Sequence, residues 1–189
     1  MSGGHGAVES SNKRVALLIS VLALFLAGAE TLAKSAQTEA LGANIEAANQ
    51  WAYFQARTIR GTVVKTADEV IALLPPGADP AALKAKRDEW AATMQRWESD
   101  PAKGEGRKEL SAKAQAAEGR RDLALERYHH YELASAAIQI GIVLASAEVI
   151  TGIVALAFAG GLLGVIGLAL ASFGLFAPHT LPHLLPFFH

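Results

Sequence analysis

The sequence predicts an all-α membrane protein in which three transmembrane helices carry a long antiparallel helical hairpin, called the stalk. The chain has 189 residues, of which 51% are apolar and 19% charged, and its mean hydropathy is +0.25. Of its 35 charged residues, 30 lie between Lys34 and Glu132, where 15 acidic and 15 basic side chains cancel. A polar middle therefore separates two apolar ends, which is typical of a membrane protein.

Composition also excludes several classes of protein. A neutral middle of mixed sign argues against nucleic-acid binding, because binding phosphates requires a basic face. The absence of cysteine rules out disulfides, thiolate metal sites and cysteine nucleophiles. The sequence has no glycine-rich phosphate loop, nucleophile motif or paired acidic site of defined spacing, so we expect neither a cofactor nor catalysis.

The first transmembrane helix is predicted over residues 15–36, after an N-terminal tail at residues 1–14. The uncharged stretch of residues 15–29 is by itself too short to cross a hydrocarbon core of about 30 Å. If the helix continues to residue 36, Glu30 and Lys34 lie four residues apart at the interface and can form an ion pair.

A cleaved signal peptide is the alternative interpretation of this segment. Two basic residues, Lys13 and Arg14, precede the apolar run, and the small triplet Ala-Gly-Ala at residues 27–29 follows it, in the order that signal peptides use. Because nothing around Ala29 breaks a helix, we expect the segment to be retained as a span.

The C-terminal third is predicted to form two further spans, over residues 134–158 and 160–177. Between residues 133 and 188 the only formal charge is Glu148. The string Ala-Gly-Gly at residues 159–161 is the predicted turn, because adjacent glycines permit a tight reversal. A tail rich in proline, histidine and aromatic residues follows, at residues 178–189.

Small residues recur at intervals of four in both of these spans, as Gly141 and Ala145 in one and Gly160 and Gly164 in the other. In lipid, small side chains let helix backbones approach closely. We interpret these residues as packing positions between the two spans, with an oligomer interface as the alternative.

The polar middle, residues 37–133, is predicted to be a helical stalk with breaks at residues 75–80 and 99–106. Two adjacent prolines end its first helix. Asp79 followed by Pro80 starts the next helix, as the N-cap and the first helical residue.

A third helix is predicted from Arg107 into the second span, after a flexible link at residues 103–106. The outward and return arms have similar lengths, about 60 Å and about 68 Å, so they match as a hairpin. Counting from the membrane ends then places position 51 opposite about position 117. Four small residues leave room there for large rings: Ala114, Ala116, Ala117 and Gly119.

Apolar residues trace one face of each arm, and these faces are predicted to form the seam of the hairpin. On the outward arm the face consists of Ala52, Ala56, Ile59, Val63, Ala67, Val70 and Leu74, and on the return arm of Leu110, Ala114, Ala117, Ala124 and Tyr128. Because these seams are mostly alanine, they bury little area and leave a single hairpin marginally stable. We therefore expect several copies to associate laterally.

The most distinctive local string is Asn-Gln-Trp-Ala-Tyr-Phe-Gln-Ala-Arg, at residues 49–57. On a helix, Trp51 and Phe54 are three residues apart, and Tyr53 and Arg57 are four apart. Two neighbouring faces therefore carry aromatic rings, and a cation caps one of them. We interpret the string as a packing cluster between helices, with an aromatic ligand site as the alternative.

This string follows one N-terminal span and precedes a charged helical stretch and a closing pair of spans that begins near Gln139. In this arrangement the chain resembles an uncharacterised family of bacterial membrane proteins, known only as a domain of unknown function. The resemblance covers most of the chain, and its core is Gln-Trp-Ala-Tyr-Phe-Gln-Ala-Arg. It implies a bacterial inner-membrane protein and supplies no activity, cofactor or catalytic residue.

Glu148 lies near the middle of the second span, where an ionised carboxylate is costly. We interpret it as a neutral carboxyl that is hydrogen-bonded to a neighbouring helix or to the same residue of another copy. The alternative is a proton or cation site, formed by a ring of such residues in several copies. Gln139, nine residues earlier, is expected to face elsewhere.

His179, His183 and His189 fall in the C-terminal tail. The first two have the spacing of metal ligands on a helix, but Pro182 lies between them and disfavours a regular helix. We interpret the tail as an interfacial segment rather than a metal site.

The predicted function is that of a non-catalytic scaffold whose partners are membrane lipid and further copies of itself. The basic pair Lys13 and Arg14, weighed against Lys34, predicts a cytoplasmic N-terminus and a periplasmic stalk. The alternative hypotheses are an accessory subunit of a larger membrane complex, and a proton or cation channel that uses Glu148.

Overall fold

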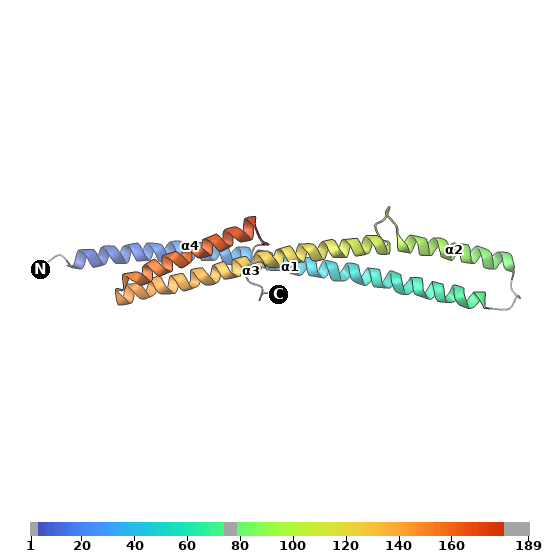
Figure 1. Ribbon diagram of the computed structural model, residues 1–189, viewed down its shortest axis with the longest axis horizontal. Helices are drawn as coiled ribbons and strands as arrows, with labels where there is room; N and C mark the ends of the chain where they lie inside the picture. Colours follow the sequence, from blue (N-terminus) through green and yellow to red (C-terminus); the bar gives the residue numbers. More distant parts are fainter. Residues whose placement is uncertain (1–3, 74–78, 180–189) are drawn as a thin grey trace. The chain divides into compact units, whose positions relative to one another are not determined.

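The computed structural model describes residues 4–73 and 79–179, and its side chains from residue 13 onward. Within this part helices are the only regular secondary structure and there is no strand, which confirms the all-α prediction. Four helices follow one another, as α1 (Gly4–Ala72), α2 (Pro80–Glu98), α3 (Arg107–Thr151) and α4 (Val154–Phe176) (Figure 1). Three of them, α1, α3 and α4, are long and apolar enough to cross a membrane.

The chain divides into two compact units. The first, called the apolar unit, comprises Met1–Leu41 and Asp122–His189, and the second, called the polar unit, comprises Gly42–Arg121. The apolar unit therefore contains all of α4 and one end each of α1 and α3. The polar unit contains all of α2 and the other ends of α1 and α3.

The start of α2 and the break before α3 agree with the sequence prediction. The side chain of Asp79 accepts a hydrogen bond from the backbone N–H of Ala81, at 2.9 Å, and Pro80 is the first helical residue. Helix α2 ends at Glu98 and α3 begins at Arg107, which leaves the predicted break at residues 99–106. The two prolines predicted to end α1 lie outside the described residues.

The predicted turn at residues 159–161 is wrong, because Gly160 and Gly161 lie inside α4. The reversal occurs instead at Gly152, whose φ of 70° is in the left-handed region that favours glycine. Its backbone N–H donates to the carbonyl oxygen of Glu148 at 2.8 Å and closes the last turn of α3. The two C-terminal helices therefore differ from the predicted ranges of 134–158 and 160–177.

The predicted N-terminal tail at residues 1–14 is helical from Gly4 onward, where α1 begins. Helix α1 is likewise continuous at residue 36, the predicted end of the first span. No proline occurs between residues 4 and 73 to interrupt it. The backbone of α1 therefore shows no break at the position where the first span was predicted to end.

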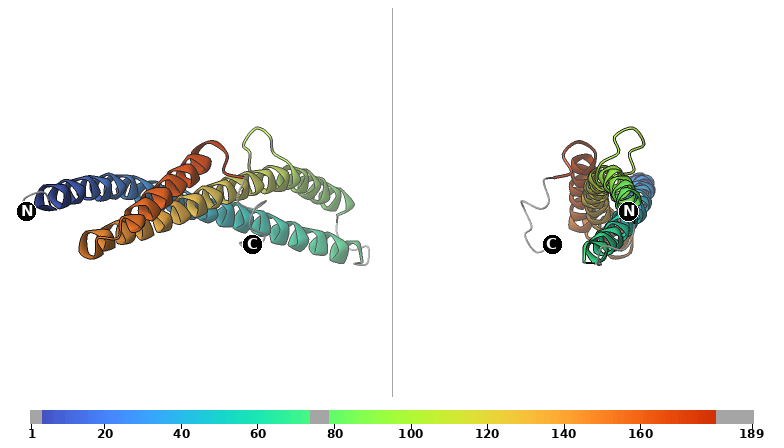
Figure 2. Two further views of the ribbon diagram at one scale, coloured as in Figure 1. Left: turned by 60° about the vertical axis from the view of Figure 1, so that its left-hand side comes forward. Right: turned by 90° about the vertical axis from the view of Figure 1, so that its right-hand side faces the viewer.

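The apolar unit is built from close contacts among α1, α3 and α4, and α3 and α4 lie side by side in both views of Figure 2. Helix α1 contributes buried residues seven apart, namely Val15, Leu22, Ala29 and Ala36. The buried residues of α4 are all glycines, namely Gly160, Gly164, Gly167 and Gly174. This unit is therefore packed largely through small side chains.

In the polar unit, α1 runs antiparallel to α2 and to the start of α3. As residue numbers rise along α1, those of the partners fall, in the pairs Glu46–Arg120, Trp51–Glu118, Arg57–Glu105 and Asp68–Arg87. Among its described residues, the buried apolar side chains are Ala43, Ala47, Leu110, Ala114 and Ala117, and α2 contributes none. Four of these five are alanine, so the core of the polar unit is thin.

The apolar face predicted as the seam of the outward arm is not the face that packs. Ala52, Ile59, Val63 and Val70 are exposed, whereas the packed face of α1 includes Ala43 and Ala47. The prediction followed hydrophobicity, but this seam combines alanine with polar side chains that find partners across the helices. The return arm was predicted correctly, with four of its five residues buried and Tyr128 partly so.

Candidate functional site

The aromatic string at residues 49–57 lies on α1 in the polar unit. The indole Nε1 of Trp51 donates a hydrogen bond to Oε1 of Glu118 at 2.9 Å, one residue from the position predicted to lie opposite. The rings of Trp51 and Phe54 meet edge to face, with centroids 5.5 Å apart. Ala114 and Ala117 of α3, two of the small residues predicted to lie opposite these rings, are fully buried.

The cation in this cluster differs from the one predicted. The guanidinium of Arg107 lies over the ring of Phe54, 5.0 Å from its centroid. Arg57 instead pairs with Glu105, its Nη2 lying 3.0 Å from Oε2. Tyr53 is exposed and takes no part in the packed cluster. The string therefore joins the two arms through Trp51, Phe54 and Arg57, with cations that come from both helices.

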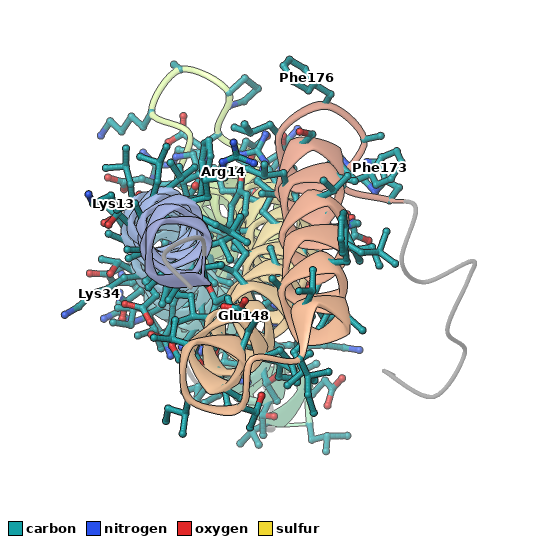
Figure 3. All side chains as sticks on the ribbon, turned by 90° about the vertical axis from the view of Figure 1, so that its left-hand side faces the viewer. Lys13, Arg14, Lys34, Glu148, Phe173 and Phe176 are labelled. Carbon is teal, nitrogen blue, oxygen red and sulfur yellow. The ribbon has the colours of Figure 1, made fainter. Side chains whose placement is uncertain are left out.

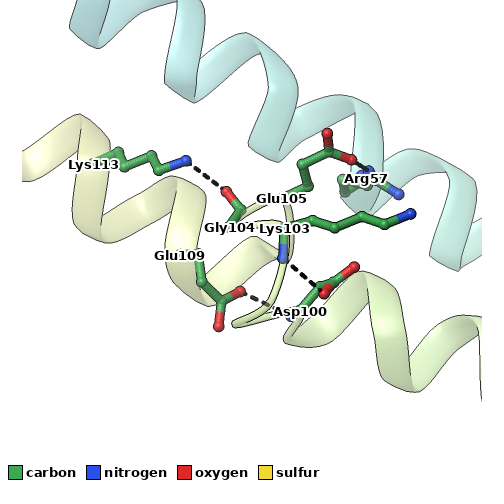
Figure 4. A network of polar contacts seen from close by, with 7 residues as sticks. All are labelled: Arg57, Asp100, Lys103, Gly104, Glu105, Glu109 and Lys113. Carbon is green, nitrogen blue, oxygen red and sulfur yellow. Dashed lines mark hydrogen bonds and ion pairs between the residues drawn. The ribbon is translucent and has the colours of Figure 1, made fainter.

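The connection between α2 and α3 is held by its own hydrogen bonds, so the flexible link predicted at residues 103–106 is wrong (Figure 4). The carboxylate of Glu109 accepts from Oγ of Ser99 at 2.7 Å and from the backbone N–H of Asp100 at 3.1 Å. These hydrogen bonds lower the pKa of Glu109, the bond from Ser99 most. Lys113 Nζ donates to the carbonyl of Gly104 at 2.7 Å.

Gly104 and Gly106 are required in this connection for different reasons. Gly104 has a φ of 65°, in the left-handed region. A Cβ on Gly106 would lie 2.5 Å from the backbone nitrogen of Asp100, so no larger residue fits there. The segment is therefore an ordered turn, in which Glu105 accepts a hydrogen bond from Arg57 on α1.

Between α1 and α2, an open cavity of about 530 Å³ is lined by both charged and apolar side chains. Its main polar feature is the bidentate pair of Arg87 with Asp68, at 2.6 and 3.0 Å. Hydrogen bonding to Arg87 lowers the pKa of the Asp68 carboxyl. These two charges therefore satisfy each other across the cavity, from α1 to α2.

Glu148 lies in the apolar unit and is only 3% exposed. Figure 3 shows it toward the centre of the three helices, whereas Phe173 and Phe176 point outward from α4. Its Oε2 is buried without a hydrogen-bond partner among the described residues. The described chain therefore gives this oxygen no hydrogen bond from a neighbouring helix, and the predicted alternative of a bond to the same residue of another copy stays a prediction.

Gln139 has a different partner. Its Nε2 donates to Oε1 of Glu30 on α1 at 3.1 Å, which links α3 to α1 within the apolar unit. This agrees with the expectation that Gln139 and Glu148 face different ways. Glu30 is therefore bonded to Gln139, whereas the sequence predicted Lys34 as its partner.

The four small residues predicted as packing positions all lie at helix contacts. A Cβ on Gly160 would lie 2.5 Å from the carbonyl oxygen of Gly141 and 3.2 Å from the backbone nitrogen of Ala145. A Cβ on Gly164 would clash with the side chain of Leu22 on α1. Gly141, Ala145 and Gly160 therefore bring α3 and α4 together. Gly164 instead lies against Leu22 of α1.

Of the two histidines considered as metal ligands, His179 lies within the described residues and His183 outside them. Nδ1 of His179 is 2.6 Å from Oε2 of Glu126, an ion pair when the imidazole is protonated. Over the described ranges, no group of three or more histidine, aspartate or glutamate side chains could hold a metal ion.

The string Tyr-His-His-Tyr at residues 128–131, which the sequence predicts as amphipathic rings where the return arm enters the membrane, contains one of the most buried side chains, His130. It is 1% exposed, and its Nε2 lies 2.9 Å from the carbonyl oxygen of Pro178. Burial lowers the pKa of this imidazole. Gly174 of α4 makes room for it, since a Cβ there would lie 2.9 Å from the Cβ of His130. Its burial was not predicted from the sequence.

Comparison with known proteins identifies a family, but the function of that family is unknown. No curated protein and no solved structure matches the chain. A family model described as "Domain of unknown function (DUF4337)" matches residues 11–177, which include every helix except the first residues of α1. The protein therefore belongs to the DUF4337 family, as its resemblance to a family of unknown function indicated.

Proposed function

We propose that this protein is a non-catalytic, homo-oligomeric scaffold of the bacterial inner membrane. In this proposal the helices of the apolar unit cross the membrane and the polar unit forms a hairpin stalk. The observation that carries the proposal is the thin core of the polar unit, in which four of the five buried apolar side chains are alanine.

The outward surface of the apolar unit supports insertion into lipid. Large apolar side chains stand exposed along all three of its helices, among them Leu17, Leu24, Val143, Ile150, Phe158, Leu162, Val165 and Phe176. Soluble monomers rarely expose contiguous apolar patches beyond a few hundred Å². In a bilayer the same side chains contact acyl chains at no cost.

The energetics of the polar unit support association. Ordering one residue opposes folding by about 1–2 kcal/mol, whereas each buried methylene-sized group contributes about 0.8 kcal/mol. An alanine seam supplies few such groups, and exposed ion pairs contribute little more. Contacts between copies would add the missing buried area.

The proposed topology has a cytoplasmic N-terminus and a periplasmic stalk. Because the chain contains no cysteine, a single Lys84→Cys variant on α2 gives the stalk one thiol. A membrane-impermeant maleimide added to intact spheroplasts should label it. Labelling only after the membrane is broken would reverse the topology.

The oligomeric state is the direct test of the scaffold. Size-exclusion chromatography with light scattering, on the full chain in mild detergent, should give a protein mass that is a multiple of 19.8 kDa. A monomer with a stable helical stalk would contradict the proposal. Purification from native membranes with a different protein at fixed ratio would favour the accessory-subunit alternative.

A further inference from the structure

Helix α1 carries a second, mainly apolar face in the polar unit, and the described chain leaves this face exposed. Its residues follow one another at alternating steps of four and three, and every one is exposed. Seven of the nine are apolar, and the other two are an asparagine and a threonine. The face, called the outer seam, consists of Ile45, Asn49, Ala52, Ala56, Ile59, Val63, Thr66, Val70 and Leu73.

The outer seam lies almost opposite the face of α1 that packs against α2 and α3. The packed face starts at Ala43 and the outer seam two residues later, which on a helix is a rotation of about 200°. Ile59, Val63 and Leu73 are 64%, 63% and 85% exposed. A shallow apolar groove of about 670 Å³ follows this side of the helix past Ile59, Val63 and Val70.

The period of the outer seam indicates what kind of surface covers it. Alternating steps of four and three repeat every seven residues, the period at which two helices wind around each other with side chains interlocked. A helix that lies on a membrane surface carries lysine and arginine around its apolar stripe. The outer seam has no such stripe of cations, so its period indicates a partner helix.

The size of the outer seam indicates where the partner comes from. From Ile45 to Leu73 it is about 42 Å long, and at a helix width of about 10 Å it covers about 400 Å² per copy. Specific complexes in solution bury about 1,200–2,000 Å² in total. The contact is therefore too small to recruit a free partner, but it suffices for a partner held nearby in the same membrane.

The residues that flank the seam allow it to pair with itself. Copies anchored in one membrane have stalks on the same side, so their helices are parallel. In a parallel pair in register, Gln55 of one copy faces Arg60 of the other, and Thr62 faces Ala67. Neither pairing brings like charges together.

Asn49 favours the same register. In the seven-residue repeat of the outer seam, the step of three after Asn49 and the step of four before it place this residue at the position called a. A single asparagine at that position is known to fix the register of parallel coiled coils, at a cost in stability, because its amide is satisfied by the same residue of the partner. Ala52 and Ala56, which follow it, allow close approach of the two backbones.

We propose that the outer seam is where two copies of this chain meet, as a parallel, in-register coiled coil of their α1 helices. This inference rests on the proposed homo-oligomeric function and names the surface that carries it. It leaves the packed face of α1 to the chain's own α2 and α3, so each copy uses two nearly opposite faces of one helix.

Cysteine cross-linking in native membranes tests the proposal, because the chain has no thiol of its own. In a parallel pair in register, position 63 faces itself at a distance that a disulfide can span. After mild oxidation Val63→Cys should give at least tenfold more disulfide dimer than the control Lys65→Cys. Lys65 is also well exposed but lies two residues away, on another side of the helix.

The two proposals fail in different ways. If light scattering shows an oligomer while Val63→Cys and Lys65→Cys cross-link equally little, the scaffold stands and the outer seam is not its interface. If the chain is monomeric and neither variant cross-links, both proposals are wrong. A disulfide from Val63→Cys to a different protein would also overturn the inference.

A second variant makes the test independent of disulfide geometry. Val63→Glu places a carboxylate on the outer seam without disturbing the packed face, so helicity by circular dichroism should be unchanged. We expect the dimer yield with a lysine-reactive cross-linker in membranes to fall at least fivefold. Lys65→Glu, which makes a larger change of charge off the seam, should leave the yield within twofold of the wild type.

Discussion

The two units pack the same kind of element, long helices, in different ways. In the apolar unit, glycines let backbones touch, as at Gly141 and Gly160, and Gln139–Glu30 is a rare polar link between helices. In the polar unit, alanines bring the helices together and side-chain pairs such as Trp51–Glu118 join them. Close backbone contact is the packing expected of helices in lipid and polar links that of helices in water, so this difference is the one that the proposed membrane insertion requires.

The largest expected effect comes from the glycine contact of the apolar unit. Gly160→Ala places a Cβ 2.5 Å from the carbonyl oxygen of Gly141, and backbone cannot move aside cheaply. We expect a loss of about 2–3 kcal/mol in unfolding free energy, measured by denaturant titration in detergent.

The matched control is the neighbouring residue. A Cβ on Gly161 would meet no atom within 4 Å, and alanine favours helix over glycine by up to about 1 kcal/mol. Gly161→Ala should therefore be neutral or stabilising. Equal losses in the two variants would contradict packing through backbone contact.

Glu148 is a buried carboxyl in the apolar unit, and its replacement has the next largest effect. Glu148→Leu removes a buried carboxyl oxygen that has no partner within the described residues, so we expect a gain of about 1–2 kcal/mol in the same titration. A loss of stability would instead indicate a partner in another copy.

The charge of Glu148 can be tested separately from its packing. Glu148→Gln keeps the volume and removes the charge. Because Glu148 is covered within its own unit, we expect wild type and variant to show equal proton leak in liposomes, at the level of empty vesicles. Faster proton or monovalent-cation flux through the wild type would support the channel alternative.

The polar links of the polar unit should each contribute less. Trp51→Phe keeps an aromatic ring beside Phe54 but removes the hydrogen bond to Glu118, so we expect a loss of about 1 kcal/mol. Tyr53→Phe is the matched control, since its side chain is exposed, and should change stability by less than about 0.5 kcal/mol. Equal effects would mean that the string is not a joint between the arms.

The smallest expected effect is a response of the polar unit to acid. The lowered pKa of Glu109 means that its ionised form stabilises the fold above the unfolded value of 4.5, and that this contribution is lost as pH falls through the folded pKa. Asp68, with its pKa lowered from 3.8, contributes in the same direction. Thermal unfolding from pH 7 to pH 3 should show a flatter decline in Glu109→Gln than in wild type.

Elements whose signals are local could be predicted from the sequence alone. An N-cap followed by proline started α2 at Pro80, because one side chain and one ring suffice to fix that end. On α3, Leu110, Ala114 and Ala117 of the predicted apolar face are buried, as expected. The position opposite Trp51 followed from helix length alone.

The use of glycines and the choice of packing face depended on contacts between distant segments. The adjacent glycines at residues 160–161 gave the stronger turn signal, but the left-handed reversal is at the single Gly152, whereas Gly160 lies against the backbone of Gly141. Which glycine turns and which packs depends on the helix that lies beside it. Helix α1 has two faces able to pack, and hydrophobicity favoured the outer one. The polar partners Glu118, Glu105 and Arg87 selected the other face, because ion pairs and hydrogen bonds between distant segments leave no periodic signal in the sequence.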